Sequence, residues 1–351
     1  MRERGEMTAL ERDQAHFEPH ASTLRARPSM VQELMAEHVI AERIIGVSSA
    51  IRRVREQIAR VARLDLPVLI QGPTGSGKEL VARALHAASQ RPGRFVAFNV
   101  CAIPESLFEG TLFGYVKGAY TGAVSGASGY LADADHGTAF ADEISGLPLS
   151  LQPKLLRAVE LREYQQLGSS TDRRSNFRLV TATNEDLTAL VAAGRFRSDL
   201  AERLSTIVID VPPLADRRED IRLLVRYFAS RAAANASGDV TTFDEDAMRV
   251  MQTYDWPRNV RELRNVVERA CAFASGPTIN ADEVVSAMGK HGRQQSAPAP
   301  TKGEEVERRQ LLALLAEMGW DTARAAERLG VHRATIYRRM QRLGIPASRM
   351  Y

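Results

Sequence analysis

The chain has 351 residues, which is enough for two or three domains around a sizeable buried core. Hydrophobic residues make up 44% of it, an ordinary value for a globular protein that excludes wholesale disorder. The 47 basic and 43 acidic residues give a net charge of +4, so total charge alone does not identify a nucleic-acid partner, and the position of the basic residues matters more.

Nothing in the sequence predicts a membrane partner or a secreted protein. No apolar run approaches the roughly 18–20 residues that cross a bilayer. The charged residues 1–6 are followed by no apolar core, so we expect no signal peptide. Cys101 and Cys271 lie far apart and match no metal-ligand spacing. We therefore expect a cytoplasmic protein with two reduced thiols that serve packing.

The first two segments of the chain differ in pattern. Residues 1–44 are polar and mixed, with one short helix expected near residues 30–41. Residues 45–237 alternate strand-like and helix-like stretches, which predicts an α/β fold with helices on both faces of a parallel sheet. Strands are expected at residues 68–70, 95–99, 138–141, 179–182 and 207–211. The helix expected at residues 79–88 should bury Leu80, Val81, Ala84 and Leu85 on one face.

The rest of the chain is largely helical by pattern. Residues 218–288 show helical periodicity almost throughout, and we place a helical lid at residues 238–288. Residues 289–303 contain no core-forming side chains and predict a flexible linker. Residues 304–351 predict a small all-α domain.

A glycine-rich loop follows the first expected strand and opens the first helix, which is the context of a phosphate-binding loop. Its backbone N–H groups and the helix N-terminus attract phosphates, and Lys78 neutralises the outer ones. Glu79 stands where the general pattern has Ser or Thr bound to Mg²⁺. The expected nucleotide-binding residues here are Gly72, Pro73, Thr74, Gly75, Ser76, Gly77, Lys78 and Glu79.

An acidic pair, Asp142 and Glu143, closes the third expected strand. An aspartate at such a position holds Mg²⁺ through water, and the adjacent glutamate polarises the attacking water as a general base. Carboxylates are common at strand ends, so the phosphate loop upstream is what favours this interpretation.

A hexapeptide between these two motifs has glycines near both ends and a single aromatic residue. The glycines allow large backbone changes, and the aromatic tip offers contact area at low entropy cost. Alone, such a hexapeptide would be an ordinary surface turn. Within an ATPase it predicts a loop that nucleotide hydrolysis moves against a partner. Its residues are Gly118, Ala119, Tyr120, Thr121, Gly122 and Ala123.

The C-terminal segment predicts a helix-turn-helix. An amphipathic helix at residues 307–318, a second helix capped by Asp321 or Thr322 and a third at residues 333–343 have the required spacing. The first helix should turn inward Leu311, Leu312, Leu314 and Leu315. From Thr322 onward seven arginines face one acid, Glu327, and this cluster favours DNA over a merely solvated basic helix. Candidate contacts to double-stranded DNA are Arg333, Thr335, Tyr337, Arg338 and Arg339.

Taken together, these motifs resemble the sigma-54-dependent transcription activators, the bacterial enhancer-binding proteins. The resemblance covers residues 45–288 and continues in a Fis-type C-terminal module. The family's phosphate loop also carries glutamate after the lysine, as Glu79 does here. The resemblance implies an AAA+ ATPase that uses ATP and Mg²⁺ and engages sigma-54 RNA polymerase through the hexapeptide, where the family usually has phenylalanine in place of Tyr120.

The resemblance also implies roles for single polar residues. Asn99 matches the asparagine that holds the catalytic glutamate in check, and Asn184 matches the sensor of the γ-phosphate. Arg197 and Arg203 match the arginine fingers that reach a neighbouring subunit's ATP. Arg261 matches the sensor arginine of the lid. The alternative for each arginine is a surface ion pair.

Three functional hypotheses follow. The leading one is an enhancer-bound oligomer, from dimer to hexamer, that hydrolyses ATP to open the closed sigma-54 promoter complex. A second is a DNA-binding regulator whose ATPase is not coupled to sigma-54, against which the intact hexapeptide argues. A third is a remodelling ATPase of another AAA+ branch, which leaves the DNA-binding module unexplained. Residues 1–44 are short for a sensor domain, so we expect control by a partner protein or by expression level.

Overall fold

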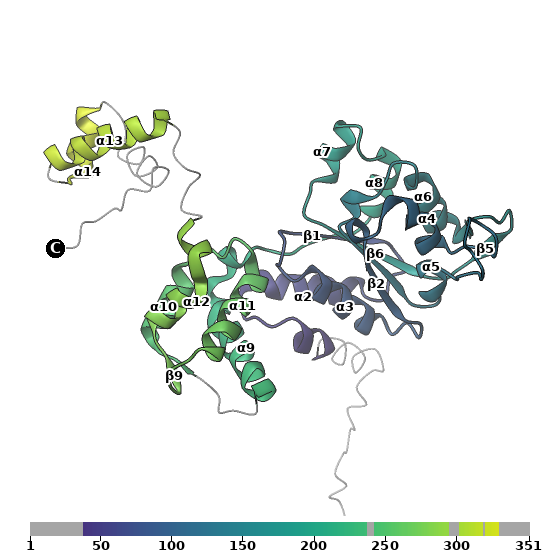
Figure 1. Ribbon diagram of the computed structural model, residues 1–351, viewed down its shortest axis with the longest axis horizontal. Helices are drawn as coiled ribbons and strands as arrows, with labels where there is room; N and C mark the ends of the chain where they lie inside the picture. The colour runs from purple at the N-terminus through teal and green to yellow at the C-terminus, as the bar shows by residue number, and fades with distance from the viewer. Residues whose placement is uncertain (1–37, 237–241, 295–301, 319, 330–351) are drawn as a thin grey trace, which may run out of the picture.

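The computed structural model describes residues 38–236, 242–294, 302–318 and 320–329 (Figure 1). Most of the N-terminal segment expected at residues 1–44 therefore lies outside the described residues. Of the helix expected near residues 30–41, residues 38–41 are described, and they are helical in a helix that continues to residue 43. No helix in the described part of the chain is both long and apolar enough to cross a membrane.

A five-stranded parallel sheet in the order β2-β3-β6-β1-β7 forms the first unit. Its strands are β1 (Val68–Gln71), β2 (Phe95–Asn99), β3 (Thr138–Asp142), β6 (Arg178–Thr183) and β7 (Val208–Asp210). They confirm the five strands expected from the sequence, each to within one residue at either end. Parallel strands buried on both faces carry near-continuous apolar runs, and β6 is buried at every position. The α/β fold predicted from the alternating pattern is thus confirmed.

Helices cover both faces of this sheet (Figure 1). One hydrophobic cluster joins the sheet to α2 (Ser49–Val61) and α3 (Lys78–Ser89). A second joins it to α4 (Glu105–Phe113), α5 (Tyr130–Asp133), α6 (Gln152–Leu161), α7 (Leu187–Ala192) and α8 (Ser198–Leu204). Shorter elements are η1 (Val100–Ala102), η2 (Ile144–Gly146) and the antiparallel hairpin of β4 (Glu163–Gln165) and β5 (Asp172–Arg174).

The buried face of α3 is shifted around the helix from the expected one, because Ala82 is buried and Leu80 is not. Val81, Ala84 and Leu85 are buried, as the sequence predicted, but Leu80 is 48% exposed. The prediction was therefore wrong for Leu80. A helix turns about 100° per residue, so Leu80 lies to one side of the buried stripe.

A helical unit follows the sheet and has its own core. It comprises η3 (Leu214–Asp220), α9 (Ile221–Ala236), α10 (Glu245–Thr253), α11 (Asn259–Ala272) and α12 (Ala281–Gln294), with two short strands, β8 (Thr242–Phe243) and β9 (Thr278–Ile279). The hydrophobic cluster of this unit already begins at Leu214, because η3 packs against both α9 and α11. We therefore propose a domain boundary just before Leu214 instead of the expected one between residues 237 and 238.

Two helices of the C-terminal module are described, α13 (Lys302–Glu317) and α14 (Thr322–Arg328). Leu311 and Leu315 are buried between them, and Leu312 and Leu314 pack at the edge of this cluster. Asp321 caps α14, since its Oδ1 accepts a hydrogen bond from Arg324 N at 3.3 Å. The expected third helix at residues 333–343 and all five candidate DNA contacts lie outside the described residues.

The linker expected at residues 289–303 is shorter than predicted. Helix α12 continues across a kink at Gly289 to Gln294, and α13 already begins at Lys302. The expected bounds were wrong at both ends, because helical turns form at residues 290–294, beyond the kink at Gly289, and α13 includes residues 302–303.

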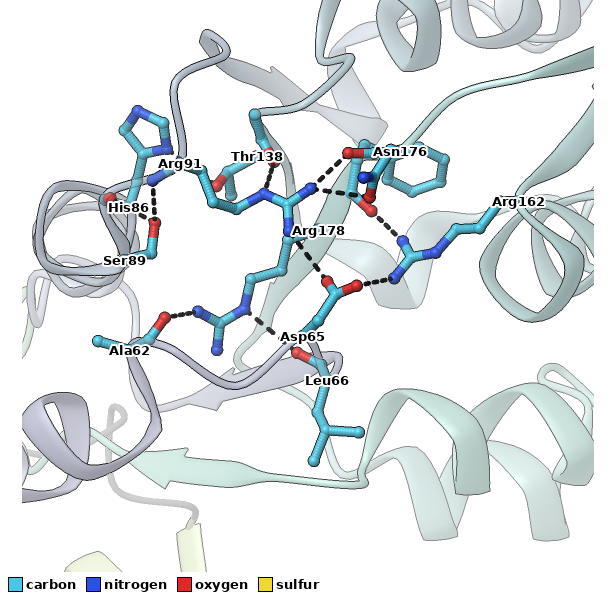
Figure 2. A network of polar contacts seen from close by, with 12 residues as sticks. Ala62, Asp65, Leu66, His86, Ser89, Arg91, Thr138, Arg162, Asn176 and Arg178 are labelled. Carbon is cyan, nitrogen blue, oxygen red and sulfur yellow. Dashed lines mark hydrogen bonds and ion pairs between the residues drawn. The ribbon is translucent and has the colours of Figure 1, made fainter.

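A network of arginines ties together the sheet edge opposite the phosphate loop (Figure 2). Arg178, only 1% exposed, donates to Leu66 O at 3.2 Å, to Val61 O at 2.9 Å and to Ala62 O. Burial lowers the pKa of Arg178 to about 10. Beside it, the Asp65 carboxylate pairs with Arg91 at 3.1 Å and with Arg162 at 3.0 Å. These contacts fasten the α2–β1 turn to the start of β6.

Replacement of Arg178 tests this anchor. Arg178→Met keeps most of the buried volume but leaves three carbonyls without their donor, so we expect the free energy of unfolding to fall by about 2–4 kcal/mol. Urea denaturation measures it. Arg174→Met is the control, because Arg174 is 82% exposed in its ion pair with Glu163, and it should cost about 0–1 kcal/mol. Equal losses in the two variants would contradict the assignment.

Candidate functional site: a nucleotide cavity and a contact loop

The glycine-rich loop, residues 72–77, joins the carboxyl end of β1 to the first turn of α3. The strand–loop–helix context that the sequence predicted is therefore present. Lys78 opens α3, and its Nζ donates to Gly72 O at 2.9 Å and Pro73 O at 3.4 Å. An ammonium group held within the loop in this way lies where anionic groups meet the helix N-terminus.

The acidic pair faces Lys78 across this site. Burial raises the pKa of Asp142, and the nearby Lys78 ammonium opposes that rise. Burial likewise lowers the pKa of Lys78, against the attraction of Asp142 and Glu143. Glu143 has φ of +55° and ψ of +49°, a left-handed conformation uncommon for a non-glycine residue, and its N–H donates to Asp142 Oδ1 at 3.0 Å. Such outliers concentrate at functional sites.

The two asparagines predicted to act here occupy different environments. Asn184 follows β6, the neighbour of β1, and its Nδ2 donates to Thr74 Oγ1 of the loop at 3.2 Å. Asn99 pairs in register with Asp142 at the ends of β2 and β3. Its Oδ1, however, accepts a hydrogen bond from Ala102 N at 3.2 Å and so caps η1.

A cavity of about 550 Å³ lies between the loop and the helical unit. Its apolar lining includes Ile44, Ile45, Ile51, Val211, Leu224 and Phe228. Its basic lining includes Arg43, Arg83, Arg231, Arg261 and Arg264. An apolar wall next to a loop of backbone N–H groups and several cations suits a ligand with a flat ring and a polyanionic tail.

The helical unit touches the loop directly through residues that sequence reasoning missed. Asn259 Nδ2 donates to Thr74 O at 3.0 Å, and Arg217 Nη2 donates to Ser76 O at 2.8 Å. Asn259 lies two residues before Arg261 in the chain, but no local signal marks either contact, since both depend on how the two units dock.

The hexapeptide at residues 118–123 forms a closed turn on the surface. Gly118 N donates to Ala123 O at 2.9 Å, and Ala123 N donates to Tyr120 O at 3.0 Å. Gly118 and Gly122 have φ of +83° and +101°, and a Cβ on either would meet nothing within 4 Å. The glycines are thus required by backbone conformation and not by lack of space.

The tip of this turn rests against its own base. The Tyr120 ring is 45% exposed and lies edge-on to Tyr115, with the ring centroids 5.3 Å apart. A hydrogen bond with Tyr115 raises the pKa of the Tyr120 hydroxyl. The base itself is held by Val116 N, which donates to Leu167 O at 3.1 Å, and by Tyr115, which exchanges two backbone hydrogen bonds with Ala127.

Three family models match consecutive parts of the chain: Sigma-54 interaction domain over residues 44–210, AAA+ ATPase lid domain over residues 215–301, and Bacterial regulatory protein, Fis family, over residues 303–343. The chain is 43% identical over 307 residues to the transcriptional regulatory protein ZraR of Klebsiella oxytoca, covering 85% of this chain and 68% of that one. The chain belongs to the sigma-54-dependent transcription activators.

Other relatives of the chain are covered by the match to different extents. The DNA-binding transcriptional activator HyfR of Escherichia coli K12 is 42% identical over 321 residues, which cover 86% of this chain but only 48% of HyfR. Among solved structures, NtrX from Brucella abortus has a TM-score of 0.65 and 33% identity, covering 89% of this chain and 72% of NtrX. Its complexes with ATP and with ADP match similarly, with TM-scores of 0.65 and 0.66.

The two candidate finger arginines of the activator lie on or beside α8. Arg197 is exposed and pairs with Asp199 at 2.7 Å, a hydrogen bond that raises the pKa of Arg197. Arg203 is half-buried, and its Nε has no hydrogen-bond partner among the described residues. Among the residues that the structure describes, no hydrogen bond or ion pair joins either arginine to the phosphate loop.

The cysteines differ from expectation in one case. Cys271 is half-buried against the core of the helical unit, as predicted for a packing thiol. Cys101 is exposed, so the prediction was wrong for it, because the chain turns into η1 at the edge of the sheet. Its Sγ lies 4.0 Å from Glu143 O, and burial followed by that contact raises the pKa of the thiol.

The close approach of the helical unit to Gly75 can be tested by alanine substitution. A Cβ on Gly75 would lie 2.2 Å from Arg258 O, whereas one on Gly194 would meet nothing within 4 Å. Both glycines have positive φ, so Gly194→Ala should cost only the left-handed strain, about 1–2 kcal/mol of unfolding free energy. Gly75→Ala should cost clearly more, because backbone must move. Urea denaturation compares them, and equal costs would contradict the docked arrangement.

Proposed function

We propose that this activator is an ATPase that binds an enhancer site on double-stranded DNA as an oligomer and opens the closed promoter complex of sigma-54 RNA polymerase. The observation that carries the proposal is the turn at residues 118–123, which is inserted in the same domain as the phosphate loop and the half-buried Asp142. That NtrX is solved with ATP and with ADP supports a nucleotide in the corresponding cavity.

Within that proposal, the residues of the cavity divide the work of phosphoryl transfer. Lys78 and the loop N–H groups would bind and orient the β- and γ-phosphates. A bound Mg²⁺ would supply neutralising charge to these phosphates, and the carboxylate of Asp142, in the lining of the same cavity, fits the single-carboxylate, water-rich coordination that Mg²⁺ prefers. Glu143 would take the proton of the attacking water.

The asparagines would control this chemistry. Asn184 contacts Thr74 of the loop, which supports a role for its amide in sensing the γ-phosphate. Asn99 is adjacent to Asp142 in the sheet, but its oxygen is engaged by Ala102 N. Restraint of Glu143 by Asn99 would therefore require either that the hydrogen bond from Ala102 N breaks or that the amide nitrogen of Asn99 donates to Glu143.

An oligomer would complete the site. Arg197 and Arg203 make no contact with the phosphate loop of their own chain within the described residues, which supports a role at the ATP of a neighbouring subunit. An arginine supplied to a phosphoryl-transfer site stabilises transition-state charge and is worth about 10³–10⁵ in rate. Arg261, in the lining of the cavity, would act within its own subunit.

The hexapeptide would carry the result of hydrolysis to sigma-54. Its backbone is held mainly by local hydrogen bonds and a partly exposed aromatic pair, so raising it disrupts few contacts. The candidate DNA contacts Arg333, Thr335, Tyr337, Arg338 and Arg339 would keep the oligomer near the promoter.

Transcription from a sigma-54 promoter in vitro, with ATP, tests the coupling. Lys78→Ala should abolish both ATP hydrolysis and activation, because it removes the positive charge that neutralises the phosphates. Thr121→Ala should keep hydrolysis within about twofold of wild type and lose activation, because it alters only the contact loop. Activation that survives Thr121→Ala would refute the proposal. Transcription that depends on a different sigma factor would favour a DNA-binding regulator with an uncoupled ATPase.

Mixing experiments test the shared site. Lys78→Ala and Arg203→Ala should each lack ATPase activity, yet an equal mixture should recover roughly a quarter of the wild-type rate, because that share of interfaces joins an intact Lys78 to an intact Arg203. Lys78→Ala mixed with Glu143→Gln is the control and should recover nothing, since both residues serve one subunit's site. A mixture with Arg203→Ala that stays at background would argue against the finger.

A further inference from the structure

Five consecutive carbonyl groups of the phosphate loop accept hydrogen bonds from side chains or from the helical unit. Lys78 Nζ holds the first two, Gly72 O and Pro73 O. The next three are each held by the helical unit. Asn259 Nδ2 donates to Thr74 O at 3.0 Å, Arg261 N to Gly75 O at 3.3 Å, and Arg217 Nη2 to Ser76 O at 2.8 Å.

The direction of these carbonyls is linked to the direction of the loop N–H groups. Each peptide unit is planar and trans, and the described residues contain no cis bond, so a C=O and the N–H of the next residue point opposite ways. Ser76 N donates to Pro73 O within the loop at 3.2 Å, so the N–H groups left for a bound phosphate are those of Gly75 and Gly77. When these two point to the phosphate, the preceding carbonyls, Thr74 O and Ser76 O, must point away from it. That is the side on which the helical unit presents its donors.

Asn259 connects three segments with one side chain. It is 3% exposed, its Nδ2 donates to Thr74 O, and its Oδ1 accepts a hydrogen bond from Leu214 N at 2.8 Å. Its φ of +55° is a left-handed conformation that asparagine tolerates better than most residues. The start of α11, the start of η3 and the phosphate loop thus meet at this amide.

Arg217 makes the third contact in a local environment that lowers the stability of the fold. It is 4% exposed and interrupts η3 with φ of −139° and ψ of +46°. Its Nε and the Oγ of Ser76 are two of the three buried side-chain polar atoms that lack a partner in the described part of the chain. Unsatisfied buried polar groups are costly, and their retention is typical of sites under functional constraint.

The segment that carries Arg217 is itself anchored to the core. Asp220, fully buried in η3, accepts hydrogen bonds from Val47 N, from Ser48 N at 2.8 Å and from Ser48 Oγ at 2.7 Å. Ser48 in turn caps α2 by accepting from Ile51 N at 3.1 Å. A change in the loop backbone would therefore move Arg217 and with it η3, whose other end is held by Asp220.

We propose that Asn259 and Arg217 are positioning residues that couple nucleotide occupancy of the phosphate loop to the position of the helical unit, through the loop carbonyls. A bound phosphate fixes the peptide planes, and the fixed carbonyls hold the helical unit and the Arg261 backbone in place. This inference rests on the proposed nucleotide site and adds the route by which its occupancy is transmitted.

The test measures ADP binding to the full chain by calorimetry. Arg217→Met and Asn259→Asp should each weaken ADP binding by roughly five- to tenfold, the effect of one lost hydrogen bond to the pre-formed loop. Asn259→Asp keeps the oxygen that accepts from Leu214 N and tolerates the positive φ, so it is expected to fold even where Arg217→Met does not. Arg217→Lys should restore affinity to within about twofold, because it can still donate to Ser76 O.

Arg218→Met is the matched control. Arg218 is the next residue in η3, but it donates to Gln252 O, Tyr254 O and Asp255, all within the helical unit. This variant should lower the melting temperature and leave ADP affinity unchanged. A second readout is amide exchange in α11, which ADP should slow in the wild type and in Arg218→Met but not in Asn259→Asp.

The outcomes separate the two claims. The inference would be overturned if Arg217→Met and Asn259→Asp both bind ADP with wild-type affinity. If Arg217→Met does not fold, wild-type affinity in Asn259→Asp alone would overturn it. An equal loss of affinity in Arg218→Met would do the same, because it would reduce the effect to general damage of the helical unit. A wild-type chain that binds no ADP would instead refute the proposed nucleotide site.

Discussion

The structure depends on the orientation of a few peptide planes between β1 and α3. The loop at residues 72–77 turns the carbonyls of Thr74, Gly75 and Ser76 to the helical unit, and planarity then directs the N–H group of each following residue the opposite way. Lys78 satisfies the carbonyls nearest the strand, and the helical unit satisfies the rest. One short backbone segment is therefore shared by the sheet, the cavity and the helical unit, and none of the three is fully defined without it.

The two ends of the parallel strands, amino and carboxyl, have opposite roles in the structure. At the edge remote from the loop, Arg178 is buried among backbone carbonyls and Asp65 joins two further arginines, so the strands start from a fixed frame (Figure 2). At the carboxyl edge lie a strained Glu143 and the phosphate loop. A firm frame at one edge makes small movements at the other reproducible, because strain is not dissipated through the core.

The sequence predicted what is encoded locally and failed where docking decides. Alternating apolar runs located all five strands to within a residue, and the strand–loop–helix context located the phosphate loop. Leu80, Cys101 and the ends of the linker were misjudged because each depends on which neighbour covers a residue or extends a helix. Asn259 and Arg217 were missed because their partners are loop carbonyls more than 140 residues away in the chain, and no spacing rule reports such a contact.

The aromatic pair at the hexapeptide has a consequence for how long a partner is held. In the folded turn, the Tyr120 ring already has a neighbour in the Tyr115 ring. Any protein that binds the tip must first separate Tyr120 from Tyr115. Its binding free energy is therefore the difference between the contact it makes with Tyr120 and the Tyr115 contact that it replaces. Such an exchange favours rapid release over a long-lived complex, as the proposed cycle of engagement and release with every turnover would require.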